Sequence, residues 1–159
     1  MAWAEIASWL TPWLEQAVFV TGLLGVWFST RQWLITWPTA LVSVTLAAVL
    51  YYQAKLYADM GLQAVYFALS IYGWVYWKAP QHAGQAPVRT TPWGRLGLLL
   101  LLGEAAALAG GWGLASHSDA ALPWLDAHTT SYSLVAQWLM SRKRIEHWLL
   151  WIAVDLTAM

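Results

Sequence analysis

Long apolar segments alternate with short polar ones along this chain. An α-helix needs roughly 20 mostly apolar residues to cross a bilayer. Five segments approach that length: Thr11 to Thr30, Trp33 to Gln53, Tyr57 to Trp77, Leu96 to Leu114 and Leu122 to Ser141. A sixth segment begins near Arg144 and continues to Met159. The pattern predicts an all-α, polytopic membrane protein in which residues 1–159 form a single transmembrane domain.

The segment before Thr11 differs from the others. Its apolar residues recur at helical spacing, which favours an amphipathic helix in the membrane interface over a further span. These residues are Trp3, Ile6, Trp9 and Leu10. The segment lacks the basic start and unbroken apolar run of a signal peptide.

Part of the first segment returns later in the sequence. Pro12-Trp13-Leu14-Glu15 reappears as Pro123-Trp124-Leu125-Asp126, and the spacing between the two prolines defines a repeat offset. The same offset pairs Leu23 with Leu134, Trp27 with Trp138, Thr30 with Ser141, Arg31 with Arg142 and Trp37 with Trp148. We interpret the chain as a duplication, with repeat one at 11–77, a connecting helix at 96–114 and an incomplete repeat two at 122–159.

The number of crossings predicts how the repeats are related. Three helices and the connecting helix precede repeat two, so both repeats begin on the same side of the membrane. They are therefore parallel, and a substrate path is expected between them. In this plan of three helices, one connecting helix and three helices (3+1+3), the counterpart of Tyr57 to Trp77 would fall beyond Met159. We expect a truncated second repeat, or a partner chain, such as a second copy in a homo-oligomer, that fills the gap.

Composition supports a membrane as the solvent. Hydrophobic residues make up 60% of the chain, above the roughly 45–50% of soluble domains, and charged residues only 10%. Lys and Arg collect in cytoplasmic loops. With alternating loops, one side holds every Lys and Arg except Lys55, namely Arg31, Lys78, Arg89, Arg95, Arg142, Lys143 and Arg144. We expect the N-terminus outside a bacterial inner membrane and a mobile cytoplasmic connector from Lys78 to Arg95.

Several classes of chemistry lack their motifs. No P-loop, HExxH or GxSxG sequence occurs, so neither ATP hydrolysis nor a familiar hydrolase is indicated, and we expect no enzyme and no cofactor. The absence of cysteine excludes disulfides and thiol catalysis. The four histidines, His82, His117, His128 and His147, do not have metal-ligand spacing. A formal net charge of zero without a basic patch argues against nucleic acid.

Polar and aromatic residues form stripes on three of the expected helices. The third helix carries Gln63, Tyr66, Ser70 and Trp74 at positions i, i+3, i+7 and i+11. The fifth carries Thr130, Ser133, Gln137 and Ser141, and the sixth continues with Trp148, Trp151 and Asp155. Because polar groups that face lipid are costly, we expect these stripes to face one another.

The sequence resembles the PnuC nicotinamide riboside transporters over about residues 15–156. The blocks that carry the resemblance are Arg31-Gln32, Trp37-Pro38, residues 56–63, residues 70–74, residues 136–139, residues 146–151 and Asp155. The resemblance implies seven helices in the 3+1+3 plan and passage of vitamin-like substrates by facilitated diffusion. Two departures are His147, where the family usually has Asn, and the last helix, which has no counterpart in this sequence.

A nucleoside-like ligand needs aromatic faces for stacking and amides or carboxylates for its ribose hydroxyls. The candidate substrate-binding residues are therefore Gln63, Tyr66, Ser70, Trp74, Thr130, Gln137, Trp148, Trp151 and Asp155. A cationic pyridinium favours indole faces and a nearby carboxylate, for which Asp155 is the candidate. Alternatives are a related vitamin, thiamine or riboflavin, and a non-transporting membrane subunit that needs a partner.

Each candidate also has a purely structural interpretation. Tryptophans commonly form interfacial belts, and Ser and Thr commonly hold helices together. Glu15 and Asp126 share a repeat position near expected helix N-termini, where structural capping is the simpler role. Glu104, in the middle of the connecting helix, is either a proton site or a buried structural contact.

Overall fold

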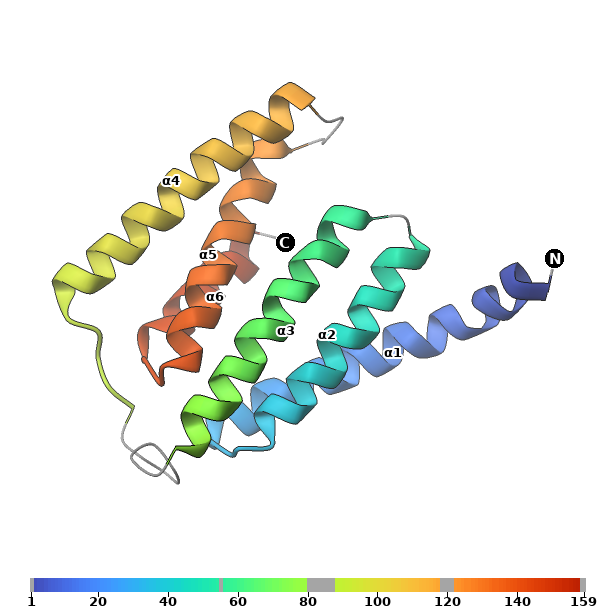
Figure 1. Cartoon of the computed structure of the whole chain (residues 1–159), viewed down its shortest axis with the longest axis horizontal. Helices are drawn as coiled ribbons and strands as arrows, with labels where there is room; N and C mark the ends of the chain where they lie inside the picture. The colour runs from blue at the N-terminus through green and yellow to red at the C-terminus, as the bar shows by residue number, and fades with distance from the viewer. Residues whose placement is uncertain (1, 55, 80–87, 118–121, 158–159) are drawn as a thin grey trace. The chain divides into compact units, whose positions relative to one another are not determined.

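Six α-helices account for most of the described residues (Figure 1). The computed structural model describes residues 2–54, 56–79, 88–117 and 122–157, without the side chains of residues 2–10, 57 and 58. The helices are α1 (Ala2–Thr30), α2 (Thr36–Gln53), α3 (Tyr57–Lys78), α4 (Trp93–His117), α5 (Pro123–Ser141) and α6 (Glu146–Thr157). No strand occurs within the described ranges, so the all-α prediction is confirmed.

The start of α1 differs from the prediction. The helix runs without a break from Ala2 to Thr30, with Pro12 inside it, so the expected separate helix before Thr11 is absent. The side chains of Trp3, Ile6, Trp9 and Leu10, on which that expectation rested, lie outside the described side chains. Glu15 is consequently interior to α1 and caps no N-terminus. Asp126 does lie in the first turn of α5, where a carboxylate interacts favourably with the helix dipole.

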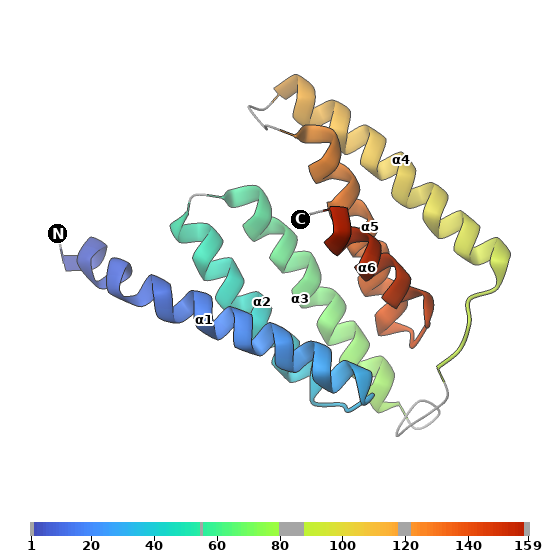
Figure 2. The same cartoon turned by 180° about the vertical axis from the view of Figure 1, so that it is seen from behind.

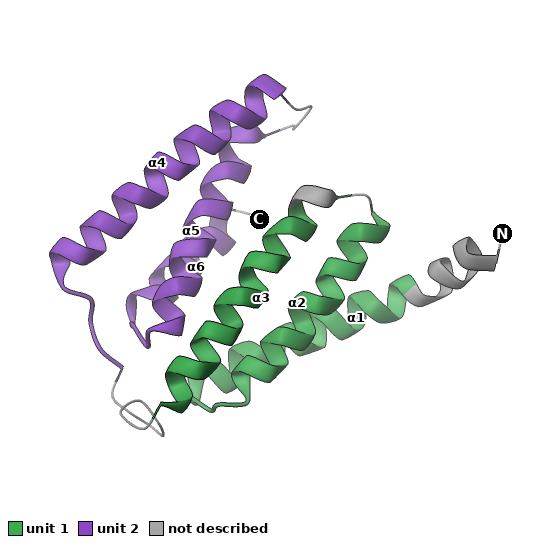
Figure 3. Cartoon of the chain, viewed as in Figure 1, with its two compact units in different colours: residues 1–86 green, residues 87–159 purple. Residues whose placement is uncertain are grey.

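The chain forms two compact units, residues 1–86 and residues 87–159 (Figure 3). In the first unit α2 packs against both α1 and α3. In the second unit α5 packs against both α4 and α6. Figure 2 shows both three-helix units from the opposite side. Each unit therefore has a central helix that is covered on two flanks.

Close packing in each unit depends on glycine. In the first unit Trp37 is 0% exposed, and a Cβ added at Gly73 would come within 2.2 Å of its ring. Trp77 meets the same indole edge-to-face, with 5.2 Å between ring centroids. In the second unit a Cβ at Gly111 would come within 2.4 Å of the Trp124 ring. Small residues thus let α3 and α4 approach their neighbours, as in membrane helix packing.

Large apolar side chains cover much of the surface of the helices. Trp93 is 88% exposed, and Trp13 and Leu149 are each 70% exposed. A protein in water rarely exposes so much apolar area, whereas lipid tails solvate it. Among the described residues, α4 is the one helix that could cross a membrane by length and composition alone. α1, α2, α3 and α5 contain more Trp, Tyr, Ser and Thr than α4 does, and α6 is only 12 residues long.

The corner between α1 and α2 has the same backbone as the corner between α5 and α6. Gln32 and Lys143, which are one repeat offset apart, both have φ of 54°. This left-handed conformation is uncommon for residues other than glycine. The hydrogen bond from the Trp33 N–H to the Phe28 carbonyl (3.0 Å) corresponds to the bond from the Arg144 N–H to the Leu139 carbonyl (2.9 Å).

Side chains repeat at the two corners as well. The guanidinium of Arg31 lies 5.0 Å from the Trp27 ring centroid, and that of Arg142 lies 4.9 Å from the Trp138 ring centroid. Both distances fit cation–π contacts. The hydroxyls of Thr30 and Ser141 donate to the carbonyls of Trp27 and Trp138, each at 2.7 Å. The residues paired by the repeat offset therefore make the same contacts in both units.

Candidate functional site

The stripe on α3 contains a buried hydroxyl with no partner. Ser70 is 0% exposed, and its Oγ has no hydrogen bond. Gln63 and Tyr66 are half-buried, and Trp74 is 36% exposed. A buried polar atom without a partner is costly, so Ser70 is a group that a bound ligand could satisfy.

Trp37 is a candidate that the stripes did not include. Its indole Nε1 is buried and unpartnered, like the Ser70 hydroxyl, and its ring packs over Gly73 of α3. The sequence offered one signal for it, because the repeat offset pairs Trp37 with Trp148, which is on the stripe of the last helix. The first unit thus holds a buried indole N–H and a buried hydroxyl that lack partners among its described residues.

The stripe on α5 is the most buried of the three. Ser133 is 7% exposed and Gln137 9%, Ser141 is 0% exposed, and Thr130 is half-buried. Ser141 uses its hydroxyl within the helix, where it donates to the Trp138 carbonyl. The Gln137 amide makes no hydrogen bond to any described residue. Because α4 and α6 flank α5, buried residues occur on two of its faces rather than on one stripe.

On α6, Trp148 and Trp151 are half-buried and Asp155 is exposed. The neighbouring His147 is 6% exposed, and its ring centroid lies 4.7 Å from that of Trp148. Its Nδ1–H donates to the Arg144 carbonyl, which leaves Nε2 as an acceptor. That Nε2 is buried without a partner.

The structure brings the candidates together in two groups. Thr130, Gln137, Trp148, Trp151 and Asp155 belong to the packed pair α5 and α6 of the second unit. Gln63, Tyr66, Ser70 and Trp74 share α3 of the first unit. That the two groups face one another across a substrate path stays a prediction.

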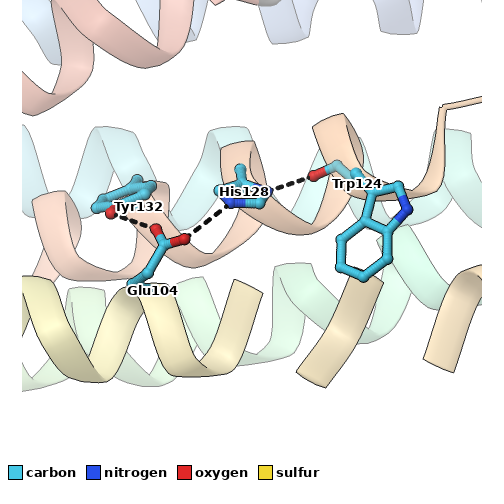
Figure 4. Close-up of polar contacts among 4 residues, drawn as sticks. All are labelled: Glu104, Trp124, His128 and Tyr132. Carbon is cyan, nitrogen blue, oxygen red and sulfur yellow. Dashed lines mark hydrogen bonds and ion pairs between the residues drawn. The ribbon is translucent and has the colours of Figure 1, made fainter. Parts of the chain in front are cut away.

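A polar cluster joins α4 to α5 (Figure 4). The Tyr132 hydroxyl donates to one oxygen of Glu104 at 2.8 Å, and the His128 Nε2 lies 3.3 Å from the other. The His128 Nδ1 lies 2.6 Å from the Trp124 carbonyl. Both ring nitrogens therefore face oxygen acceptors, an arrangement that suits an imidazolium with two N–H donors. Of the two roles considered for Glu104, the structure shows the helix-to-helix contact, with the carboxylate side chain still 42% exposed.

The corner of the second unit gathers cations. Arg142, Lys143 and Arg144 follow α5, and Arg89 is hydrogen-bonded to this corner through its backbone. Lys143 is 6% exposed, and burial lowers the pKa of its ammonium. Among the described residues, no group of three or more side chains could hold a metal ion.

The sequence matches the family described as nicotinamide mononucleotide transporter over residues 12–159. The nicotinamide riboside transporter PnuC of Escherichia coli is 27% identical over 169 residues, which cover 90% of this chain and 71% of PnuC. The riboflavin/roseoflavin transporter RibM of Streptomyces davaonensis is 26% identical over 148 residues, which cover 91% of this chain and 69% of RibM.

A solved structure resembles the whole chain. The crystal structure of the vitamin B3 transporter PnuC superposes with a TM-score of 0.75 at 27% sequence identity. The match covers 98% of this chain and 69% of the crystallised chain. The similarity therefore includes all six helices.

Proposed function

The chain belongs to the family of nicotinamide mononucleotide transporters, and we propose that it carries nicotinamide riboside across the bacterial inner membrane by facilitated diffusion. The family consists of multi-pass membrane transporters rather than enzymes. The substrate follows the relative named a nicotinamide riboside transporter, which aligns with 90% of this chain. The absence of any nucleotide-binding motif supports facilitated diffusion over ATP-driven transport.

The Gln137 amide carries this proposal. It is 9% exposed on α5 and makes no hydrogen bond to any described residue. Removing an amide to which a bound substrate is hydrogen-bonded costs about 1–3 kcal/mol of binding free energy. A ribose hydroxyl or a carboxamide would satisfy the Gln137 amide, because an amide can both donate and accept.

We propose that aromatic and acidic side chains of the neighbouring α6 also bind the substrate. Trp148 and Trp151 are half-buried and offer indole faces, the best partners for a cationic pyridinium. Asp155 offers a countercharge. In the first unit, Gln63, Tyr66, Ser70 and Trp74 are the further residues that we propose bind substrate, and the unpartnered N–H of Trp37 is an additional donor. Thr130, which is half-buried on α5, adds a hydroxyl.

The arrangement that we propose is the 3+1+3 plan with parallel repeats and an outside N-terminus. The matching corners at Gln32 and Lys143 support the duplication. Within the first unit the cation Arg31 directly follows α1, and Lys78 is the last residue of α3. Within the second unit Arg89 and residues 142–144 meet at one corner. Cations gathered at one end of each unit agree with cytoplasmic placement of those ends.

The experiment is uptake of labelled nicotinamide riboside into proteoliposomes that contain the protein. Gln137→Ala should weaken the apparent affinity roughly 5- to 150-fold, because a substrate group loses its buried partner. Gln16→Ala is the matched control, since Gln16 is an exposed glutamine on α1 without a hydrogen bond to any described residue. Equal affinities in the two variants would refute the role of Gln137.

Riboflavin is the second candidate, because RibM aligns with 91% of this chain. A flavin ring is neutral, so it gains little from a countercharge. Asp155→Asn should therefore weaken binding of the cationic riboside and leave riboflavin binding unchanged. Tighter binding of riboflavin than of the riboside by the unaltered protein would favour this second candidate, and the same comparison with thiamine tests that vitamin.

A further inference from the structure

The chain segment just before α4 is fastened to the corner between α5 and α6. The Arg89 N–H donates to the Lys143 carbonyl at 3.1 Å, and the Ile145 N–H donates to the Arg89 carbonyl at 3.2 Å. These two bonds form an isolated parallel bridge between Arg89 and Arg144. The Arg144 guanidinium adds a bond to the Thr90 carbonyl at 2.8 Å.

The carboxylate of Glu146 adds two further hydrogen bonds between this segment and α6. Both oxygens of Glu146, the first residue of α6, accept from the same partner. The Thr91 N–H donates to Oε1 at 2.7 Å, and the Thr91 hydroxyl donates to Oε2 at 2.9 Å. Thr91 is only 9% exposed. Hydrogen bonds to an ionised acceptor are roughly twice as strong as neutral ones, so this pair is the strongest link between the segment and α6.

The corner itself does not need this carboxylate. The corner of the first unit has the same backbone, yet Ile35 stands one repeat offset before Glu146. That corner uses a different bond, from the Thr36 hydroxyl to the Gly25 carbonyl at 2.9 Å. A corner of this shape can therefore form without the carboxylate of Glu146, so the bonds of Glu146 to Thr91 have another role.

We propose that Thr91 and Glu146 are positioning residues that fix the start of α6, and with it the faces of Trp148 and Trp151, for the substrate. The inference rests on the proposed function. Trp148 follows Glu146 by two residues, and its N–H donates to the Ile145 carbonyl at 3.2 Å, so a shift of the first turn moves its indole. The pair touches no substrate and acts through α6.

A capping role alone makes a different prediction. A carboxylate in the first turn of a helix interacts favourably with the helix dipole whatever its other partners are. If Glu146 only capped α6, removal of the Thr91 hydroxyl would leave α6 and substrate affinity unchanged. The Thr91 variants therefore separate positioning from capping.

The test compares Thr91→Val, Thr91→Ser and Thr90→Val by two measurements: riboside uptake into proteoliposomes and amide hydrogen exchange of α6. Valine replaces the Thr91 hydroxyl without changing the side-chain size, and serine restores the donor. Thr90 is exposed, and its side chain makes no hydrogen bond to any described residue, so Thr90→Val is the matched control. We expect Thr91→Val to raise KM roughly tenfold with the maximal rate within about twofold, and to speed exchange around Trp148. Thr91→Ser and Thr90→Val should match the unaltered protein.

Two results would overturn the inference. One is an unchanged KM in Thr91→Val, whether or not the maximal rate falls. The other is equal exchange of α6 amides in Thr91→Val and Thr90→Val. If the unaltered protein fails to take up the riboside, the proposed function fails, and the exchange of α6 alone decides whether the pair holds the helix.

Discussion

The two corners that lie one repeat offset apart share a backbone conformation and differ in the side chains around it. At the corner between α1 and α2, Trp37 is 0% exposed and its ring rests on Gly73. At the corner between α5 and α6, the equivalent Trp148 is half-buried beside His147. The ring of the first tryptophan is fully packed within its unit, with only its N–H left without a partner, whereas the second has part of its indole exposed. The turn is thus the same at both corners, whereas the burial of the tryptophan that follows it differs.

The shared part of the corner identifies what the turn requires. Both corners have a left-handed residue, a Trp–Arg stack and a hydroxyl bonded back to a tryptophan carbonyl. Residues inside the turn differ, with Gln32 against Lys143 and Trp33 against Arg144, and so do those after it, with Ile35 against Glu146 and Thr36 against His147. The backbone of the turn therefore tolerates these changes, and the role that we propose for Glu146 belongs to the start of the helix that follows.

The largest expected difference between the two corners is in the stability lost when Trp37 or Trp148 is replaced by alanine. Trp37→Ala should lower the free energy of unfolding by about 3–5 kcal/mol, because it removes a fully buried aromatic side chain. Trp148→Ala should cost less stability but weaken riboside binding by about 1–2 kcal/mol through loss of a stacking and cation–π face. Thermal unfolding in detergent and equilibrium riboside binding measure the two effects. Equal stability losses in both variants would break the comparison.

Gly73 should be intolerant of a side chain. A Cβ at this position meets the Trp37 ring at 2.2 Å, so Gly73→Ala should destabilise the first unit by about 1–3 kcal/mol. Gly61→Ala is the control on the same helix, since nothing lies within 4 Å of its added Cβ. Thermal midpoints that fall equally in the two variants would show that Trp37 does not depend on this contact.

Substitution of glycine for the two residues with positive φ, Gln32 and Lys143, tests whether the two turns contribute equally to stability. Gln32→Gly and Lys143→Gly should each stabilise by up to about 1 kcal/mol, because glycine adopts a positive φ without steric cost. Lys143→Gly also removes a buried ammonium whose pKa is lowered by burial. That burial penalty is complete below the folded-state pKa and disappears as pH rises through the ordinary pKa of lysine. The excess stabilisation of Lys143→Gly should therefore shrink at alkaline pH, and an excess that grows with pH would contradict it.

The smallest effect is expected when the first corner is given the carboxylate of the second, by the substitution Ile35→Glu. Ile35 is 50% exposed, so Ile35→Glu should change stability by less than about 0.5 kcal/mol. Riboside affinity should also stay the same, because the proposed role of Glu146 requires Thr91 as its partner. A clear gain or loss of affinity measured for Ile35→Glu would show that a carboxylate at this corner acts without Thr91.

The lengths of the apolar segments predicted the helices well, because a helix that crosses a bilayer needs a long apolar segment. They placed α2 and α3 within three residues of their observed bounds. The prediction failed at the start of α1, where a separate interfacial helix was expected before Thr11 but one helix runs through Pro12; the same Pro-Trp-Leu sequence does begin α5. A proline is favourable in the first turn of a helix, and sequence alone does not show whether a helix extends before it.

Contacts between distant segments were beyond sequence reasoning. The connector from Lys78 to Arg95 was expected to be mobile, yet Arg89 and Thr91 are hydrogen-bonded to the second corner. No local sequence pattern predicts these hydrogen bonds between distant segments, because their donors and acceptors are mainly backbone groups. The unpartnered Trp37 N–H was also missed, since burial without a partner is a property of packing. The polar stripe on the fifth helix predicted Gln137 as a candidate. Only the structure shows that its amide makes no hydrogen bond to any described residue.

The most direct test is riboside exchange across a membrane that contains only this protein. Proteoliposomes loaded with unlabelled nicotinamide riboside are diluted into labelled riboside, with and without an imposed pH or sodium gradient. The proposed facilitated diffusion predicts rapid entry of label, the same final ratio of inside to outside concentration with either gradient, and no entry in protein-free vesicles. No protein-dependent entry, or accumulation above the outside concentration that follows an ion gradient, would contradict it.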